Sequence, residues 1–176
     1  MPELSQNTPP PVAIVVSRYN DSITSPLRDG AIQAYAERYA EGGPLAVIDA
    51  PGAFELPAIA SAAIQSGLYA GVVCLGCVIK GETTHDVHLN SAVAEALASL
   101  SVAAGLPVAF GVLTCQNADQ ARDRAGGAKG NKGHEAMTAV LQALDAIRAI
   151  EDAADAEQPA FEFTLDRAPS DKAENA

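Results

Sequence analysis

Short apolar runs alternate with longer amphipathic segments along most of this chain. The apolar runs cover residues 12–16, 45–48, 72–79 and 108–113. They are continuous, as expected for strands that are covered on both faces of a parallel sheet. Segments with helical periodicity follow them, at residues 22–40, 54–66, 84–104, 117–124 and 135–150. This alternation predicts an α/β fold, a three-layer α/β/α sandwich with a four-stranded parallel sheet.

Polar and glycine-rich segments follow the predicted strands. They cover residues 17–21, 50–55, 80–86 and, after a short helix, 124–133. Ligands of open α/β sheets bind beyond the carboxyl ends of the strands, so we expect the functional site among these segments.

The segment after the third predicted strand contains His85. Thr83 is placed to cap the following helix, with Asp86 three residues later as in a capping box. Free N–H groups at such a helix start suit a phosphate. The positive end of the helix dipole favours a neutral imidazole, which can accept a proton as a general base. The alternative is a pair of plain capping residues beside a surface histidine.

Three basic residues gather in a glycine-rich segment of this chain, namely Arg124, Lys129 and Lys132. Together they can neutralise a phosphate, because a guanidinium offers fork-like contacts to its oxygens. A solvated loop is the alternative interpretation.

Two aromatic residues, Tyr19 and Phe54, lie in the segments that follow the first two predicted strands. They can flank a planar heterocycle, or they can belong to the local core. Glu55 fits either a carboxylate at a helix start or an acceptor for the N–H groups of a ligand.

Charge narrows the class of partner. The chain of 176 residues carries 22 acidic and 11 basic side chains, a formal net charge of −11, and no tryptophan. Such a surface disfavours nucleic acid and anionic membranes. The polar segment 1–11 has no signal-peptide pattern, and we expect no apolar run long enough to span a bilayer. We therefore expect a cytoplasmic protein.

Two residue patterns resemble a redox pair and a metal site, but their context in the chain supports neither. Cys74 and Cys77 match C-x-x-C, but they lie inside a predicted strand, whereas redox pairs lie at helix starts. His85, Asp86 and His88 lack a fourth metal ligand. We expect neither a redox pair nor a metal site.

Four segments resemble the successive signatures of the 6,7-dimethyl-8-ribityllumazine synthase family. They are residues 17–20, 51–55, 76–85 and 130–133, and the resemblance runs in order from about Val12 to Ile150. It implies a flavodoxin-like fold and a transferase that condenses 5-amino-6-(D-ribitylamino)uracil with 3,4-dihydroxy-2-butanone 4-phosphate. This reaction is the penultimate step of riboflavin biosynthesis and requires no cofactor or metal.

The resemblance also implies a role for individual residues. His85 matches the proton-transfer residue, Tyr19 the aromatic that stacks on the pyrimidine, and Phe110 a pocket residue from the neighbouring subunit. The implied contacts to ribitylaminouracil are Tyr19, Ala53, Phe54, Glu55, Cys77, Val78, Ile79, Phe110 and Lys132. The implied contacts to the butanone phosphate are Glu82, Thr83 and Arg124. Asp86 and His88 depart from the residues that many members carry beside the histidine, and Cys77 replaces a frequent threonine or serine.

Members of this family form pentamers with active sites between neighbouring chains, and some assemble into hollow shells of 60 subunits. We expect a homo-oligomer, with the shell as the preferred form and riboflavin synthase as a candidate partner. The family core would span residues 12–150, between a flexible segment 1–11 and a flexible acidic tail 151–176. In that tail Phe161, Phe163 and Leu165 alternate with polar residues. This pattern fits either a short strand that docks on the core or a segment that makes only transient contacts.

Three other functions remain open from the sequence. The first is a non-catalytic lumazine- or flavin-binding shell protein of the same fold, which the presence of His85, Arg124 and Lys132 disfavours. The second is a flavodoxin-like electron carrier or regulatory domain. The third is an archaeal-type riboflavin synthase, which would consume lumazine.

Overall fold

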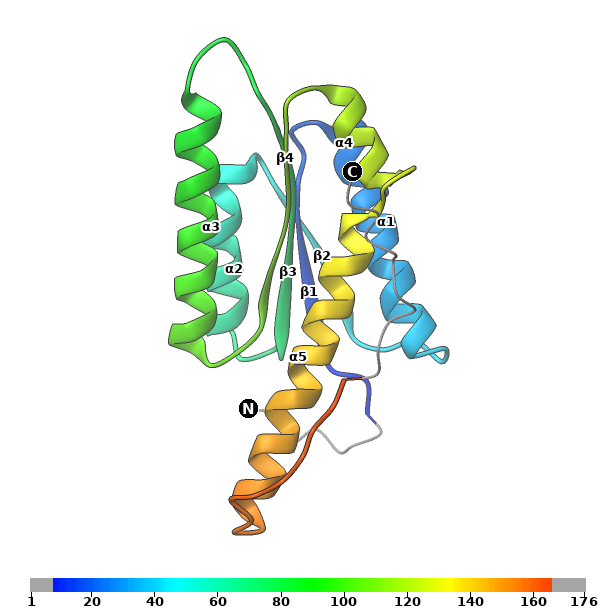
Figure 1. Ribbon diagram of the computed structural model, residues 1–176, viewed down its shortest axis with the longest axis vertical. Coiled ribbons are helices and arrows are strands. Elements are labelled where there is room, and N and C mark those ends of the chain that lie inside the picture. Colours follow the sequence, from blue (N-terminus) through cyan, green and yellow to red (C-terminus); the bar gives the residue numbers. More distant parts are fainter. Residues whose placement is uncertain (1–7, 166–176) are drawn as a thin grey trace. The chain divides into compact units, whose positions relative to one another are not determined.

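The computed structural model of the protein describes residues 8–165 (Figure 1). The chain forms two compact units, Met1–Leu144 and Asp145–Ala176. The first unit contains the sheet and most of the helices.

Four parallel strands form the sheet of the first unit, in the order β2-β1-β3-β4. They are β1 (Val12–Ser17), β2 (Leu45–Ala50), β3 (Gly71–Ile79) and β4 (Val108–Cys115). The two central strands, β1 and β3, are buried along nearly their whole length. This explains why their sequences are continuously apolar. The predicted four-stranded parallel sheet is confirmed.

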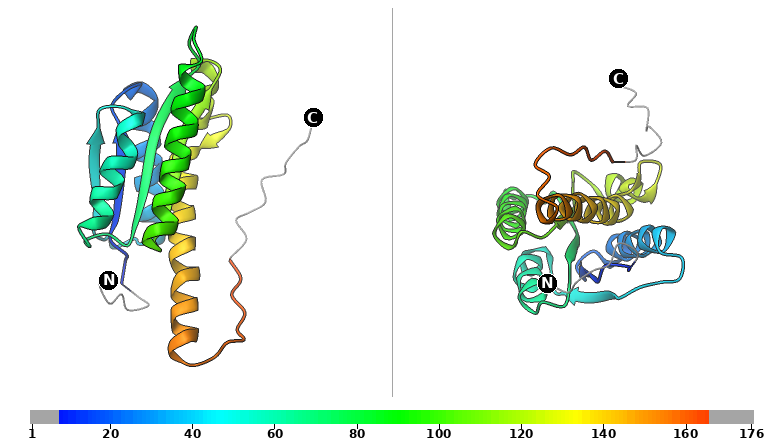
Figure 2. Two further views of the ribbon diagram at one scale, coloured as in Figure 1. Left: turned by 90° about the vertical axis from the view of Figure 1, so that its left-hand side faces the viewer. Right: turned by 90° about the horizontal axis from the view of Figure 1, so that it is seen from below.

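Helices cover both faces of this sheet (Figures 1 and 2). Val12, Ile14 and Val16 of β1 pack with α1 (Asp21–Arg38), α4 (Ala118–Arg124) and the start of α5 (Lys132–Asp155). Ala13 and Val15 face the opposite way, and pack with α2 (Leu56–Gln65) and α3 (His85–Ala104). Because side chains alternate along a strand, one apolar strand supplies both cores. The predicted three-layer sandwich is confirmed.

The start of α3 differs from the predicted capping box. Thr84 is the residue before the helix, and the hydroxyl of Thr83 accepts a long bond of 3.4 Å from the His85 N–H. The Oδ1 atom of Asp86 is buried without a hydrogen-bond partner among the described residues. The predicted capping box is wrong. Thr84, and not Thr83, is the residue before the helix, so Asp86 is not three residues after the capping residue and does not reach back to Thr83.

The glycine-rich segment expected as a loop contains a short antiparallel hairpin. Its strands are β5 (Ala125–Gly127) and β6 (Gly130–Asn131). Gly126 and Gly130 have φ angles of 110° and 79°, a region that favours glycine. The glycines therefore shape this turn.

Asn131 connects the start of α5 to α1. Its side-chain amide donates to the Pro26 carbonyl at 2.9 Å, and its Oδ1 accepts from the N–H groups of Gly133 and His134 at 2.9 and 3.2 Å. These last two bonds cap the helix, as asparagine does at helix starts. The segment 130–133 thus has a structural task that the sequence analysis did not foresee.

The N-terminal end of the described chain packs onto α1. Pro10 is buried, and its carbonyl accepts a bond of 2.8 Å from the Tyr35 hydroxyl. Burial, with a smaller contribution from Tyr39, raises the pKa of Tyr35 to about 12. Pro10 therefore belongs to the packed part of the chain, two residues before the predicted start of the family core at residue 12. Residues 1–7, part of the segment expected to be flexible, lie outside the described residues.

The second unit begins inside α5, which continues to Asp155. The predicted helix 135–150 is therefore too short, and the segment 151–176 begins with five helical residues. Phe161, Phe163 and Leu165 form no strand and are exposed. Residues 166–176 lie outside the described part, so the flexibility of the tail stays a prediction.

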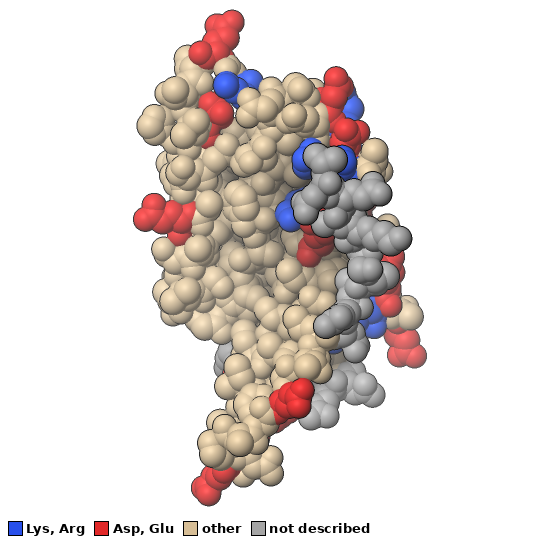
Figure 3. All heavy atoms as spheres, viewed as in Figure 1, with Lys and Arg blue, Asp and Glu red and all other residues tan. Residues whose placement is uncertain are grey.

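The helix α3 is apolar in composition. By length and composition alone, its 20 residues suffice to cross a membrane, contrary to the sequence expectation. Val93 and Leu97 are buried, but Val87 and Val102 are exposed and little of the helix is covered. Much of the surface over α3 is uncharged (Figure 3).

Candidate active site

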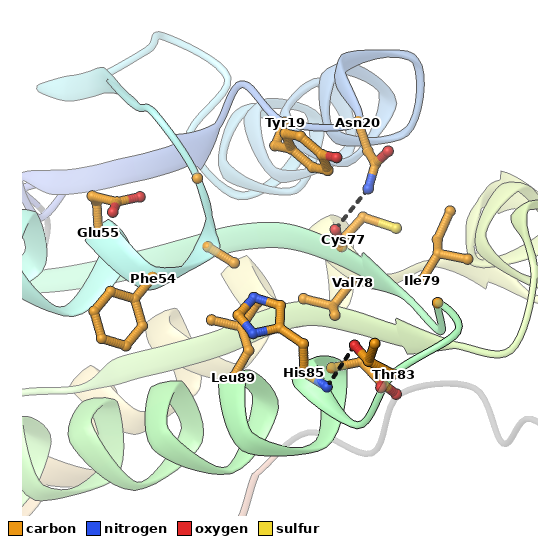
Figure 4. A pocket seen from close by; sticks show the side chains of 14 residues that line it. Tyr19, Asn20, Phe54, Glu55, Cys77, Val78, Ile79, Thr83, His85 and Leu89 are labelled. Carbon is orange, nitrogen blue, oxygen red and sulfur yellow. Dashed lines mark hydrogen bonds between the residues drawn. The ribbon is translucent and has the colours of Figure 1, made fainter.

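A cavity of about 680 Å³ opens beyond the carboxyl ends of the strands (Figure 4). This is the usual size of a small-molecule site. Its walls come from the β1–α1 and β2–α2 connections, the end of β3 and the start of α3. The lining residues are Tyr19, Asn20, Gly52, Ala53, Phe54, Glu55, Cys77, Val78, Ile79, Gly81, Thr83, His85, Asp86 and Leu89.

This cavity brings together most of the site residues predicted from the sequence. They come from chain segments far apart in the sequence, and they are Tyr19, Ala53, Phe54, Glu55, Cys77, Val78, Ile79, Thr83 and His85. Their contacts with individual substrates stay predictions.

The two aromatic residues of the site are exposed. Tyr19 and Phe54 retain 71% and 67% of their accessible surface, so neither belongs to the local core. Both line the cavity from different connections (Figure 4). A short 3₁₀ turn, Ala53–Glu55, precedes α2 and carries Phe54 and Glu55 to the wall. Exposed aromatic faces beside a cavity are suited to stacking on a planar ligand.

His85 is the first residue of α3, and its imidazole points into the cavity (Figure 4). Leu89, one turn further along the helix, lines the cavity beside it. The positive end of the α3 dipole lies next to the turn of Gly81 and Thr83, so an anion and a proton acceptor can share one end of the cavity.

The basic residues predicted to bind phosphate lie outside the cavity lining. Arg124 ends α4 and donates to the Gln120 carbonyl at 3.3 Å. Lys132 forms an ion pair of 2.9 Å with Glu135. Among the described residues that line the cavity there is no lysine or arginine. The described lining therefore offers a bound phosphate no cationic side chain.

Two further predicted residues are also absent from the cavity lining. Phe110 is half-buried in β4 and packs against the core on the α2 and α3 side of the sheet. Glu82 is exposed between Gly81 and Thr83, which do line the cavity.

The three cysteines are free and buried. Cys74 and Cys77 belong to different cores on opposite faces of the sheet, so this C-x-x-C pair does not form a disulfide. Burial raises the pKa of Cys74 to about 12 and, with a contribution from Cys115, that of Cys77 to about 11. Burial also raises the pKa of Cys115, an effect that Arg124 opposes. These thiols are poor nucleophiles at neutral pH, because the thiolate is the reactive form.

Sequence reasoning assigned no role to Asn20, which also lines the cavity. Its side-chain Nδ2 donates to the carbonyl oxygen of Cys77 at 2.9 Å. Its φ of 62° lies in the left-handed region, which asparagine tolerates better than most residues. An asparagine in the segment that follows the first strand was the available signal, but its partner is 57 positions away.

A parallel sheet covered by helices, with a cavity beyond the strand ends, defines an α/β protein built around a small-molecule site. Residues 10–148 match the family described as 6,7-dimethyl-8-ribityllumazine synthase. The chain belongs to this family, which confirms the resemblance seen in the sequence.

Three curated relatives carry the family name. The 6,7-dimethyl-8-ribityllumazine synthase of Syntrophus aciditrophicus is 45% identical over 113 residues, which cover 64% of this chain and 73% of the relative. The 6,7-dimethyl-8-ribityllumazine synthase 1 of Caulobacter vibrioides is 44% identical over 125 residues, or 69% and 80% of the two chains. The Rhodopirellula baltica protein of the family name is 46% identical over 117 residues, or 66% and 76%.

Proposed function

We propose that this protein condenses 5-amino-6-(D-ribitylamino)uracil with 3,4-dihydroxy-2-butanone 4-phosphate to 6,7-dimethyl-8-ribityllumazine. It is thereby an enzyme of riboflavin biosynthesis, a transferase. The observation that carries the proposal is the single cavity that gathers His85 and most of the predicted uracil contacts in a member of this family. No feature of the cavity favours the non-catalytic shell protein.

The reaction divides into steps that each move a proton. The pyrimidine amine attacks the ketone, and water leaves as an imine forms. Tautomerisation to an enamine allows phosphate to leave, and the ribitylamino nitrogen then closes the ring with loss of a second water. His85 projects into the cavity, where a neutral imidazole can relay these protons.

Positioning supplies much of the acceleration in this proposal. Tyr19 stacks on the pyrimidine, while Cys77, Val78 and Ile79 contact its edge. The phosphate lies toward the turn of Gly81 and Thr83. Holding two reactants in register can lower a barrier by about 7–11 kcal/mol.

A homo-oligomer completes the site in this proposal. A phosphate needs a cation, and the described cavity lining contains neither lysine nor arginine. Arg124, Lys132 and Phe110 of a neighbouring copy would supply the missing contacts. The exposed apolar surface of α3 supports an assembly of several copies. We propose a pentamer, which assembles further into a shell of 60 subunits.

We propose a cytoplasmic protein that binds neither nucleic acid nor membranes, for which the net charge of −11 gives support. The free cysteines are compatible with a reducing compartment. Riboflavin synthase, which would use the product, is a candidate partner.

Product analysis tests this function. The purified protein is incubated with both substrates, and lumazine and phosphate are quantified. The proposal expects equal amounts of the two products, and none above the uncatalysed level when either substrate is omitted. An assembled protein that binds ribitylaminouracil without accelerating product formation would instead be a non-catalytic binding protein.

A further inference from the structure

Asn20 occupies an unusual place at the junction of β1 and α1. Among the described residues, it shares a positive φ outside glycine with Glu157 alone. Its backbone carbonyl accepts bonds from the N–H groups of Ile23 and Thr24 at 2.8 and 3.0 Å, at the first turn of α1. The backbone thus starts the helix, and the side chain is free for a separate task.

That side chain continues the connection between the two central strands beyond the end of their ladder. The parallel pairing of β1 with β3 ends at Val16 and Leu75. Cys77 lies two residues further along β3, so its carbonyl points to the same side as that of Leu75. The Asn20 amide donates to this carbonyl at 2.9 Å and takes the place of the next ladder bond (Figure 4).

This bond joins two walls of the cavity. Tyr19, the proposed stacking residue, precedes Asn20 on one wall, and Cys77 begins the β3 end that is proposed to meet the pyrimidine edge. The backbone of Tyr19 is itself held by a bond of 3.2 Å from its N–H to the hydroxyl of the buried Ser17. The bond from Asn20 to Cys77 therefore ties the segment that carries the stacking ring to the strand end, beyond the last paired residues of the ladder.

We propose that Asn20 is a positioning residue that sets the width of the pyrimidine slot by tying the Tyr19 segment to the carbonyl of Cys77. This inference rests on the proposed function, because it takes ribitylaminouracil as the occupant of the slot. Asn20 acts on binding of this substrate through Tyr19 and Cys77. It leaves the proposed phosphate end of the cavity, near Gly81 and Thr83, unaffected.

The substitution Asn20→Gly removes the side chain but keeps the backbone conformation. Glycine adopts a φ of 62° readily and retains the carbonyl that accepts from α1, so the fold is preserved. The matched control is Ser101→Ala. Ser101 donates to the Leu106 carbonyl at 2.7 Å, in the connection from α3 to β4, which enters the sheet at the opposite end from the cavity.

We expect the variant to change KM for one of the two substrates and to leave KM for the other unchanged. For Asn20→Gly, KM for ribitylaminouracil rises roughly 3- to 10-fold, the range that follows from loss of one hydrogen bond. KM for the butanone phosphate stays unchanged, and so do both constants in Ser101→Ala. An equal change in both KM values, or none in either, would overturn the proposal.

Asn20→Asp adds a readout that a purely structural role would not change. An ionised carboxylate cannot donate to the Cys77 carbonyl, whereas the protonated acid can. The ratio of variant to wild-type Kd for ribitylaminouracil, measured by calorimetry, is therefore large at pH 7.5 and falls as the pH is lowered toward 4, where an ordinary aspartic acid takes up a proton. Both proteins share the neighbouring titratable groups, which are Asp21, Glu55, His85 and Asp86, and the ratio removes their common contribution. A ratio independent of pH would contradict the proposal.

Calorimetry also separates this inference from the function on which it rests. Binding of ribitylaminouracil alone requires no turnover. If the wild type binds it and the variants lose affinity as described, the role of Asn20 holds even where no lumazine forms. Lumazine formation with unaltered affinity in both Asn20 variants would support the function and overturn the role of Asn20.

Discussion

Gly133, in the first turn of α5, lies directly against the backbone carbonyl of Leu27 in α1. A Cβ atom at position 133 would overlap the oxygen of this carbonyl. Asn131, two residues before Gly133, stabilises the same contact because its side-chain amide donates to the carbonyl of Pro26 in α1. The segment that carries Lys132 is therefore placed by the packing of two helix backbones.

Gly133→Ala should destabilise the protein, because neither backbone can move away without disturbing a helix. Overpacking of this kind costs roughly 1–3 kcal/mol in the free energy of unfolding. Denaturant unfolding measures it, with Gly81→Ala as the control, since no atom lies within 4 Å of a Cβ there. Equal stability of the two variants would show that the helices separate at little cost.

His85→Ala should slow lumazine formation without abolishing it. General acid–base catalysis contributes on the order of 10²-fold or more, while the positioning of the two substrates remains in the variant. Steady-state kcat is the measurement, on protein whose particle mass equals that of the wild type. Complete loss of activity in such protein would mean that proton transfer, and not positioning, dominates.

Arg124→Ala should raise KM for the butanone phosphate by about tenfold or more, because a charge-assisted contact to phosphate is lost. Arg122→Ala is the matched control. Arg122 is on the same helix, but its guanidinium pairs with Asp119 at 2.6 Å. If the two variants have the same KM for the phosphate substrate, Arg124 does not bind it.

The pair of Glu37 and His134 should make stability depend on acid pH. The bond of 2.8 Å to His134, and then the bond to Gln33, hold the pKa of Glu37 below its ordinary value of 4.5. A depressed pKa contributes stability that is present above the unfolded value and is lost as pH falls through the folded value. The Tm difference between wild type and Glu37→Gln should therefore shrink from pH 6 to pH 3.5. A difference that grows over this range would contradict the assignment.

Particle mass tests the proposed assembly. Size-exclusion chromatography with light scattering should find a species many times the 18.0 kDa chain, and a shell of 60 copies is preferred. A pentamer alone would remove the shell and keep a site shared between copies. A monomer with full activity would contradict the shared site.

The fold could be predicted because its signals are local. Continuous apolar runs identified all four strands of the parallel sheet, and Gly105, with a φ of 64°, ends α3 where the sequence analysis placed its end. The site followed from the strand ends, where Tyr19 and His85 were expected and now line one cavity.

The missed features depend on contacts between distant parts of the chain. The bond from Asn20 to Cys77 spans 57 positions, and that from Asn131 to Pro26 spans 105. No local pattern carries such information. The capping box failed for a different reason, since a shift of one residue in the start of α3 removed the partner of Thr83.

The rate of lumazine formation above the uncatalysed reaction tests the central claim most directly. The protein is titrated with each substrate near neutral pH while product absorbance is followed, and the spontaneous rate is subtracted. We predict saturation with both substrates and a rate proportional to protein concentration. A folded, assembled protein that gives only the spontaneous rate would contradict the account.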